Sequence, residues 1–193
     1  MDSWSDIKRW RWQTRKLLIR QRVELAAGTR LAQGEQVKRN LTGAIDLTPY
    51  RTLGIYWPIR GEIDVRDIAQ QHIAGGGLAA LPVVATAAAP LEFWRWHPGM
   101  GIRHDSAKIP IPAVREVVIP DALLIPLVGF DQGRFRLGYG GGYYDRTLAA
   151  LSPRPMCVGL GYEAARLATI HPQPHDIPMD MIVTEQGLLR LTD

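Results

Sequence analysis

Short apolar runs alternate with amphipathic segments along most of this chain, and that alternation constrains its fold more than any other feature. Runs of this kind, rich in β-branched and aromatic residues and bounded by turn residues, predict buried strands. The predicted strands cover residues 52–58, 77–84, 91–96, 122–128, 156–162, 180–184 and 188–191. Strands that alternate with helices predict a mostly parallel α/β sheet with right-handed crossovers.

Helical patterns occupy the segments between these strands. The predicted helices cover residues 6–26, 30–45, 64–74 and 143–151. Ser5 or Asp6 can cap the first helix, Gly28 can end it, and Asp64 can cap the third. The alternating run at 91–96 is predicted to be an outer strand.

The segment 99–112, which holds glycine, proline and charged residues, is predicted to be a loop. The chain has 193 residues, close to the size of one domain. We expect a single domain over residues 1–193, in which the N-terminal helices (about 6–45) pack on the α/β core.

Composition excludes several classes of protein. Hydrophobic residues make up 46% of the chain and charged residues 22%, close to the globular average and unlike disordered chains. The longest apolar run, about residues 75–91, is too short and too rich in glycine and proline for a membrane span. The single cysteine, Cys157, excludes an internal disulfide and is expected to be inert core. Because the sequence shows no apolar signal segment at its start, we expect a cytoplasmic protein. As for the oligomeric state, a monomer is favoured.

The positive charge of the chain is concentrated at its N-terminus. The net charge is +4, and the first 22 residues hold seven Lys or Arg against two Asp. Arg11 and Arg15 share one helix face, where two guanidinium groups can grip phosphate oxygens; a solvated basic face is the alternative. Tryptophans interleave with these cations, as in nucleic-acid-binding segments, but the stretch is short, so nucleic acid is not expected as a partner.

The segment Arg136–Arg146 (RLGYGGGYYDR) follows a predicted strand and opens a predicted helix. Its four glycines allow backbone N–H groups to face one anion beside the positive end of the helix. This favours phosphate binding over a turn needed only for packing, and Arg136 and Asp145 add a phosphate clamp and a magnesium ligand. The segment is neither a Walker A loop nor a dinucleotide fingerprint, since Tyr143 stands at the third glycine position.

Glu62 follows the carboxyl end of a predicted strand, where open α/β sheets hold their ligands. It can accept hydrogen bonds from a heterocycle, although a solvated loop acid is the alternative reading. His171 and His175 are four residues apart, but the prolines between them exclude a helical zinc motif.

The ordered motifs resemble the 5-formyltetrahydrofolate cyclo-ligase family, also called methenyltetrahydrofolate synthetases. The resemblance runs from about residue 8 to 190, and the glycine–tyrosine–aspartate block is its most specific part. The matching segments are Arg11-x-x-x-Arg15 with Arg22, Tyr56-Trp-Pro…Gly61-Glu62-Ile-Asp64, Leu81-Pro-Val-Val, Leu91-Glu-Phe…Trp96-x-Pro-Gly, Pro126-x-x-Gly-Phe-Asp131, Gly133-x-x-Arg136 through Arg146, Gly159-x-Gly-Tyr and His175-Asp-Ile-Pro-Met-Asp180 through Glu185.

The resemblance implies a three-layer αβα fold with a mostly parallel sheet, like that of ribose-5-phosphate isomerases and CoA transferases. It implies cyclisation of 5-formyltetrahydrofolate to 5,10-methenyltetrahydrofolate through an iminophosphate, with release of ADP and phosphate. The implied partners are ATP as co-substrate, Mg²⁺ as cofactor and a reduced folate that can carry a polyglutamate tail.

The resemblance also implies roles for residues. The implied catalytic residues are Arg136, Tyr143 and Tyr144. The implied ATP-binding residues are Arg11, Arg15, Arg136, Gly138, Tyr139, Gly140, Gly141, Gly142, Tyr143 and Tyr144. The implied folate-binding residues are Trp57, Glu62, Gly141, Gly142 and Tyr143, and the implied metal ligands are Asp145 and Asp180.

Three positions depart from the family pattern. Arg11 stands where the family often has Lys, Ile111 where it usually has Glu, and Ala165 near a usual Gln. The last two concern substrate contact and leave two alternatives open. One is an ATP-dependent relative that acts on another formyl or amide substrate, and the other is a non-catalytic nucleotide- or folate-binding module.

Overall fold

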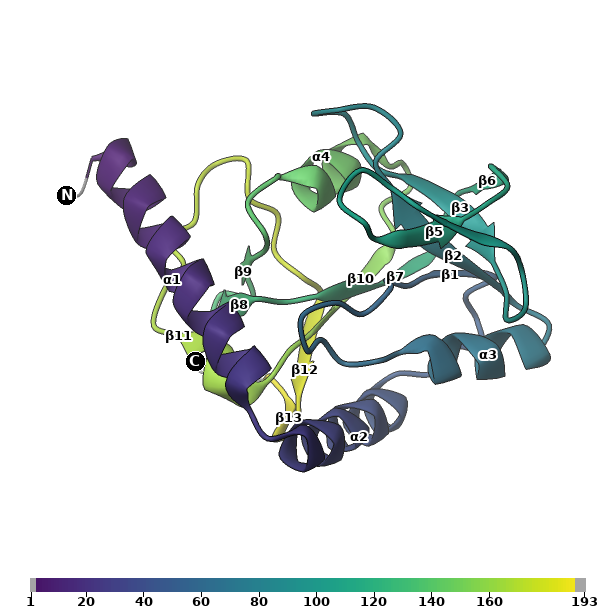
Figure 1. Cartoon of the computed structure of the whole chain (residues 1–193), viewed down its shortest axis with the longest axis horizontal. Helices are drawn as coiled ribbons and strands as arrows, with labels where there is room; N and C mark the ends of the chain where they lie inside the picture. Colours follow the sequence, from purple (N-terminus) through teal and green to yellow (C-terminus); the bar gives the residue numbers. More distant parts are fainter. Residues whose placement is uncertain (1–2, 190–193) are drawn as a thin grey trace.

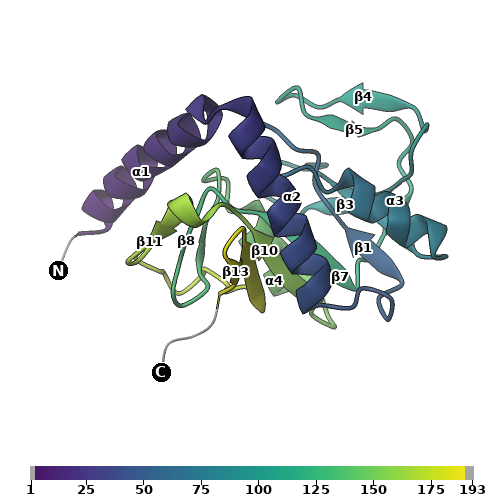
Figure 2. The ribbon, with the colours of Figure 1, turned by 90° about the horizontal axis from the view of Figure 1, so that it is seen from below.

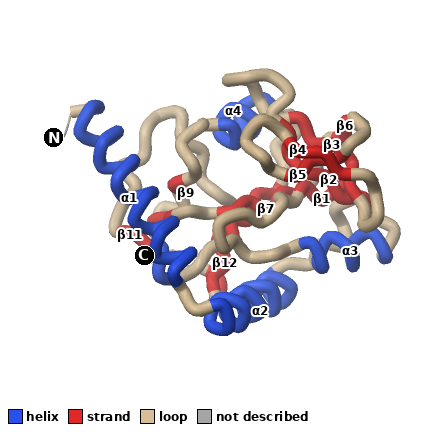
Figure 3. Tube along the Cα trace, viewed as in Figure 1, coloured by secondary structure: helices blue, strands red, loops and turns tan. Residues whose placement is uncertain are grey.

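A central sheet of eight strands forms the middle of the molecule (Figures 1 and 3). The computed structural model describes residues 3–189. The strand order is β13-β12-β10-β7-β1-β2-β3-β6, with parallel pairing from β12 to β2 and antiparallel pairing at both edges. The strands are β1 (Thr52–Gly54), β2 (Leu78–Val83), β3 (Glu92–Trp96), β6 (Val117–Val118), β7 (Ala122–Pro126), β10 (Met156–Leu160), β12 (Met181–Thr184) and β13 (Gly187–Leu188). The predicted mostly parallel sheet is confirmed.

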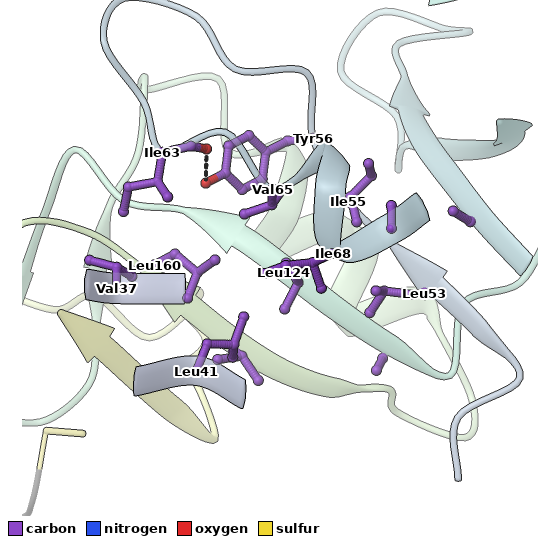
Figure 4. Close-up of a cluster of buried hydrophobic side chains, with 14 of the residues drawn as sticks. Val37, Leu41, Leu53, Ile55, Tyr56, Ile63, Val65, Ile68, Leu124 and Leu160 are labelled. Carbon is purple, nitrogen blue, oxygen red and sulfur yellow. Dashed lines mark hydrogen bonds between the residues drawn. The ribbon is translucent and has the colours of Figure 1, made fainter. Parts of the chain in front are cut away.

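Helices cover both faces of this sheet, which gives three layers that Figure 1 shows from the side and Figure 2 from the face that carries two of the helices. Helices α2 (Ala27–Ala44) and α3 (Arg66–Ala74) lie on one face, and α4 (Tyr143–Ala150) lies on the other. Strand β7 shows why: Leu124 packs in the cluster that holds Leu41 of α2, whereas its neighbour Leu123 packs with Leu148 of α4. Successive side chains of a strand point to opposite faces, so an unbroken apolar run needs cover on both. Figure 4 shows the α2 and α3 side of this core.

A second, smaller sheet lies beside α1 (Trp4–Glu24), at the end of the molecule (Figure 1). It consists of β8 (Gly129–Asp131), β9 (Arg136–Leu137) and β11 (Arg166–Leu167), and the short 3₁₀ helix η1 (Glu163–Ala165) leads into β11. Leu18 of α1 packs against residues of this region, including Val128 and Leu137. The N-terminal helix is therefore held by a part of the chain more than a hundred residues later.

The helix ends differ from the predictions by a few residues. Helix α1 begins at Trp4 because Ser3, and not Ser5 or Asp6, is its N-cap. Asp6 completes the capping box by accepting the Ser3 N–H. The predicted Asp64 cap of α3 is one residue early: Val65 is the N-cap, while the Asp64 carboxylate accepts the N–H of Arg66, the first helical residue, and pairs with the Arg66 side chain.

The remaining helix bounds show smaller shifts. Helix α1 ends at Glu24, before Gly28, and α2 begins at Ala27 and not at residue 30. Helix α4 ends one residue before the predicted position, at Ala150.

The strand predictions fail where the chain leaves the sheet early. Strand β1 has only three residues: the Ile55 N–H still bonds the Ala80 carbonyl, and the chain then leaves the sheet, with the Tyr56 hydroxyl donating to the Ile63 carbonyl (Figure 4). The predicted outer strand is an inner one, since β6 pairs with the free side of β3. The predicted 188–191 strand is β13 over Gly187–Leu188; Arg190 and Leu191 lie outside the described residues.

The predicted loop at 99–112 is instead a hairpin of β4 (Ile102–His104) and β5 (Pro110–Pro112). Its turn is held by the Asp105 carboxylate, which accepts the N–H groups of Ala107 and Ile109. A polar turn residue and two prolines in one strand hide this hairpin from a search for alternating apolar residues.

Candidate active site

Three arginines on the inner face of α1 reach three different segments of the chain. Arg11, Arg15 and Arg22 lie at positions that recur on one helical face, and α1 buries Arg11, Leu18 and Arg22 there. Each guanidinium group bonds atoms that are 38 to 165 residues distant in sequence. The helix therefore joins the parts of the site, and the three arginines define three subsites along it.

Arg22, Tyr139 and Glu62 form one hydrogen-bonded group, here called the Glu62 network, in which the arginine and glutamate side chains are buried. Arg22 Nη2 donates to the Tyr139 hydroxyl at 2.8 Å, and that hydroxyl donates to Glu62 Oε1 at 2.6 Å. Arg22 Nη2 also lies 3.8 Å from Glu62 Oε1. Helix α1, the segment after β1 and the glycine-rich segment therefore meet at one carboxylate.

The rest of the Arg22 guanidinium fixes the surrounding backbone. It donates to the carbonyls of Arg60 and of Leu127, both at 3.0 Å. Leu127 follows the carboxyl end of β7, and Arg60 lies in a tight turn with Gly61, at φ values of +48° and +77°. The Glu62 network thus lies at the carboxyl ends of β1 and β7, the edge where parallel sheets hold ligands.

Glu62 is buried in this network. Its side chain is 3% exposed, and Oε2 accepts the N–H of Ile59 at 2.9 Å. Burial raises the pKa of Glu62, and the bonds from Tyr139 and Ile59 and the charge of Arg22 offset this only in part. A buried carboxylate whose pKa is raised is typical of a binding or catalytic position.

The glycine loop, residues 138–142, leads from β9 into α4. Gly142 is the N-cap of α4 in the left-handed region, at φ +65°, where a side chain would be strained. A Cβ at Gly141 would lie 2.7 Å from the Tyr143 ring, so any other residue there would force that ring to move. Arg15 Nε donates to the Gly138 carbonyl at 2.7 Å, and its guanidinium lies against Gly140.

Arg15 retains donors that other protein groups do not use. Within residues 3–189, its Nε–Gly138 contact is the hydrogen bond the structure gives it. The side chain is half-buried, and burial together with the nearby Arg11 charge lowers its pKa. A half-buried guanidinium with free N–H groups beside a glycine-rich turn is well suited to bind phosphate oxygens.

Arg11 is placed differently from its expected phosphate role. Its Nε donates to the Ile170 carbonyl at 3.0 Å, and its Nη2 donates to the His171 carbonyl and to Asp176. The side chains of Arg11 and Asp176 are 8% and 9% exposed. The prediction that Arg11 binds phosphate therefore has no free donor pair to support it.

The two histidines singled out from the sequence lie against tryptophans of α1. Trp10 meets His171 edge-on with ring centroids 4.7 Å apart, and Trp4 meets His175 at 6.4 Å. These aromatic contacts flank the Arg11–Asp176 pair and fix the first half of α1 to the segment before β12.

Arg136 and the start of α4 form a further subsite, outside the three that the α1 arginines define. Arg136 Nη2 pairs with Asp145 Oδ1 at 2.9 Å, and its Nη1 donates to the Ile177 carbonyl at 2.8 Å. Its guanidinium also lies 5.8 Å from the centroid of the Tyr144 ring. The Tyr144 hydroxyl is buried and has no hydrogen-bond partner among residues 3–189.

The two predicted metal ligands differ in what they already bind. Both oxygens of Asp180 are used, Oδ2 by the Cys157 N–H at 2.8 Å and Oδ1 by Arg154 at 3.0 Å. It precedes β12 and so lies at the amino ends of the parallel strands, opposite the edge of Glu62. Asp145 uses Oδ1 for Arg136 and the Ile177 N–H, which leaves Oδ2 without a protein partner that the structure shows.

This difference bears on a magnesium ion. No cluster of three or more His, Cys, Asp or Glu side chains suited to a metal occurs among residues 3–189. Mg²⁺ is commonly held by one or two carboxylates together with substrate phosphates and water. Asp145 fits that mode, whereas the predicted role of Asp180 stays a prediction that its two existing bonds do not favour.

Trp57 and the two departures from the family pattern lie in packing positions. Trp57, half-buried in the segment before Glu62, packs edge-on against Trp96 at 6.5 Å and carries the Arg66 guanidinium 4.6 Å over its ring. Ile111 is 3% exposed and packs with Val83 and Trp94.

Ala165 is part of η1 and packs with two of the apolar clusters. Cys157 is buried in β10, where burial raises its pKa to about 11, as expected of an inert thiol. None of these positions adds a polar group to the Glu62 network.

Two hollows lie on the side of α2. The larger, about 820 Å³, is at the amino ends of the strands, far from the Glu62 network, and residues 42–51 and 75–77 form most of its wall. The smaller, about 260 Å³, borders Glu62 and is walled by α2 and Tyr162. The chemistry of the side chains, and not the size of the hollow, locates the site.

Buried charged groups at the carboxyl ends of parallel strands, beside a glycine loop that opens a helix, define an α/β enzyme that acts on small molecules. No helix among residues 3–189 is long and apolar enough to cross a membrane.

Comparison with known proteins identifies the family. Residues 7–185 match the model of the 5-formyltetrahydrofolate cyclo-ligase family. The 5-formyltetrahydrofolate cyclo-ligase of Escherichia coli K12 is 30% identical over 86% of this chain and 96% of its own. That of Mycolicibacterium smegmatis is 26% identical over 93% and 96%.

Solved structures agree with this result. The 5,10-methenyltetrahydrofolate synthetase of Aquifex aeolicus superposes with a TM-score of 0.80 at 28% identity, over 95% of this chain and 93% of its own. That of Mycoplasma pneumoniae gives a TM-score of 0.75 at 23% identity, over 91% and 98%, and supports the fold.

The chain belongs to the 5-formyltetrahydrofolate cyclo-ligase family, as the motif resemblance implied. It is accordingly a ligase of folate and one-carbon metabolism. Arg22 is the site residue that sequence reasoning did not assign. It was noted only as part of a motif, although its spacing from Arg11 and Arg15 on one helical face could have indicated an inward position.

Proposed function

We propose that this chain closes the ring of 5-formyltetrahydrofolate to 5,10-methenyltetrahydrofolate and uses ATP to do so. The observation that carries the proposal is the Glu62 network. It joins the segment expected to hold a pterin to the glycine loop expected to hold phosphate through the bond from Tyr139 to Glu62. Two substrates that must react with each other need adjacent binding segments of this kind.

The reaction requires a better leaving group on the formyl carbon. In the proposed sequence, the formyl oxygen attacks the γ-phosphorus of ATP, and ADP leaves. The folate N10 then attacks the formyl carbon of the resulting iminophosphate. Phosphate departs with the former formyl oxygen, and the N10 proton is released as the five-membered ring closes. Such a reaction depends mainly on positioning the two substrates and neutralising polyphosphate charge.

The arginines supply that neutralisation in the proposal. Arg15 binds ATP phosphates through its free N–H groups, while the backbone of the glycine loop faces the same anion. Arg136, held by Asp145 and the Ile177 carbonyl, presents a fixed positive charge beside Tyr144. The unpartnered Tyr144 hydroxyl is placed to donate to a substrate oxygen.

Asp145 is the carboxylate that would hold magnesium, through the oxygen that Arg136 and Ile177 do not use. When bound, the ion would neutralise charge on the phosphates of ATP. Asp180 holds the Cys157 N–H and Arg154, and in this proposal it supports the start of β10.

Glu62 and Trp57 bind the folate in the proposal. A reduced pterin presents adjacent N–H donors along one edge, and a carboxylate can accept two of them. The burial of the Glu62 side chain strengthens these bonds and penalises ligands that leave the acid unpaired. The free, buried thiol of Cys157 agrees with action in a reducing cytoplasm.

The test is a turnover assay with purified protein, 5-formyltetrahydrofolate, ATP and Mg²⁺, followed by the absorbance of the methenyl product. Stoichiometric methenyl product and ADP are expected. ATP hydrolysis without methenyl product would favour a relative with another substrate, and binding of either ligand without turnover would favour a non-catalytic module.

A single substitution tests the place of Asp145. Asp145→Asn keeps the size of the side chain but removes its charge, so turnover should fall far more than stability. Turnover is measured across a magnesium titration, with Asp46→Asn, an exposed aspartate remote from the site, as the matched control. Normal turnover of Asp145→Asn at every magnesium concentration would contradict the assignment.

A further inference from the structure

The structure shows Glu62 already occupied by a protein donor. The Tyr139 hydroxyl donates to Oε1 at 2.6 Å, and the Ile59 N–H donates to Oε2 at 2.9 Å. With 3% of its side chain exposed, the carboxylate cannot receive a pair of N–H donors from a heterocycle in this arrangement. One of the two protein donors must therefore move before a ligand can reach the Glu62 carboxylate.

Tyr139 is the part that can move. Ile59 N–H belongs to the backbone of the turn that Arg22 fixes through the Arg60 carbonyl. Tyr139, in contrast, is 40% exposed and lies between two glycines, Gly138 and Gly140, the latter at φ +97°. Nothing lies within 4 Å of a Cβ built on Gly138, so the loop has free space at that position.

We infer that Tyr139 is a positioning residue that occupies the folate-binding carboxylate until folate displaces it. The inference rests on the proposed function, since it takes Glu62 as the folate acceptor. The phenol O–H supplies to the carboxylate the hydrogen bond that a pterin N–H supplies in the complex. The buried acid therefore keeps a donor in both states, which avoids the cost of an unpaired buried carboxylate.

Displacement of Tyr139 also changes the nucleotide subsite. Tyr139 lies between Gly138, whose carbonyl binds Arg15 Nε, and Gly140, which lies against the Arg15 guanidinium. When folate moves Tyr139, the loop moves with it and releases Arg15 Nε, which adds a donor to the free N–H groups that bind phosphate. Folate should therefore increase the affinity for ATP, and by linkage ATP should increase the affinity for folate by the same factor.

The test is a set of affinities for Tyr139→Phe, which lacks the hydroxyl and retains the ring. Removing the competing donor should strengthen binding of 5-formyltetrahydrofolate by about tenfold, the effect of one hydrogen bond to a charged group. Titration calorimetry of 5-formyltetrahydrofolate without nucleotide measures this. Tyr139→Ala is the second variant, and Tyr50→Phe, at the opposite edge of the sheet, is the matched control.

The coupling is measured separately with a non-hydrolysable ATP analogue. In the wild-type protein, saturating 5-formyltetrahydrofolate should tighten binding of the analogue several-fold, and in Tyr139→Phe this ratio should approach one. Both results support the inference.

The contrary outcomes are distinct from a failure of the proposed function. Folate affinity that is unchanged or weaker in both Tyr139 variants would overturn the inference, because folate would then reach Glu62 without displacing Tyr139. An unaltered coupling ratio in Tyr139→Phe would overturn the link to Arg15. A wild-type protein that binds no 5-formyltetrahydrofolate would overturn the proposed function itself.

Discussion

Two buried arginine–carboxylate contacts lie on the same face of α1. The differences between them distinguish a contact that stabilises the fold from one that belongs to the candidate site. At one, Arg11 meets Asp176 with both side chains below a tenth exposed, and every donor group of the arginine is used. At the other, Arg22 lies 3.8 Å from Glu62, and a tyrosine hydroxyl stands between them.

The pKa shifts of the two carboxylates have opposite signs. Burial raises the pKa of Asp176, but the bonds from Arg11 and the Gln173 N–H outweigh it, so the pKa is lowered overall. Burial raises the pKa of Glu62, and its bonds do not compensate. A carboxylate whose pKa is lowered by folding stabilises the fold above that pKa, whereas a buried carboxylate whose pKa is raised is more typical of a binding or catalytic position.

Arg11→Ala should have the largest effect, and it tests whether the Arg11–Asp176 contact serves stability. Removing one partner leaves the Asp176 charge buried and unpaired, which should lower the free energy of unfolding by about 3–5 kcal/mol. Denaturant unfolding measures the loss. Arg9→Ala is the control, because Arg9 pairs with Asp6 at the exposed surface and should change little. Weaker ATP binding in an Arg11→Ala protein of normal stability would restore the phosphate role predicted from the sequence.

Glu62→Gln should act on binding and not on the fold. It replaces one acceptor by a donor, so affinity for 5-formyltetrahydrofolate should fall by about 1–3 kcal/mol, with ATP affinity nearly unchanged. Separate calorimetric titrations with the two ligands measure this, and Glu24→Gln on the outer side of α1 is the control. Normal folate affinity in the variant would remove Glu62 from the site.

Arg15→Ala tests the middle position of the same helix face. If the free N–H groups of Arg15 bind phosphate, their removal should weaken ATP binding by about 1–3 kcal/mol, the range for hydrogen bonds to charged groups. Folate affinity measured without nucleotide should fall less. Lys16→Ala, the exposed neighbour, should leave ATP affinity near that of the wild type. If the two variants bind ATP equally well, this face of α1 holds no nucleotide.

The smallest expected effect is the pH dependence of stability. Because the pKa of Asp176 is lowered by folding, its stabilisation is present above the ordinary pKa of an aspartate and lost as the pH falls through the lower folded value. The pKa of Glu62 is raised, so stability decreases as the pH rises from the ordinary pKa of a glutamate through the higher folded value.

Unfolding free energies measured from about pH 3 to pH 7 should separate the two groups. Asp176→Asn should reduce the loss on the acid side, and Glu62→Gln should reduce the decrease on the rising side. Equal slopes in both variants and the wild type would show that neither shift contributes.

The sequence predicts most of the fold because the signals are local. Apolar runs such as Leu123–Ile125 give the buried strands, and the glycines before Tyr143 mark the turn into α4. The hairpin of β4 and β5 is not predicted, because its turn depends on the side chain of a single residue, Asp105. The early end of β1 is not predicted because the apolar pattern of residues 55–58 continues after the strand has ended.

The site is less predictable than the fold. Arg11 and Arg15 are equivalent in sequence, four residues apart on a basic helix, yet one is fully bonded and the other is not. Their partners lie 123 to 165 residues away, so no local pattern can distinguish them. For the same reason the family resemblance assigns Tyr139 to the ATP site, and no local sequence pattern indicates its hydrogen bond to Glu62.

The long separation between α1 and its partners also has a consequence for biosynthesis. Helix α1 leaves the ribosome first, but the Ile170 carbonyl and Asp176 that receive Arg11 follow 159 and 165 residues later. Contacts of such sequence separation close late and slow folding. The second half of α1 can contact its partners, such as Arg60 and Leu127, earlier in translation, but the first half lacks the acceptors of Arg11 and the His171 ring that packs on Trp10 until residues 170–176 have been made.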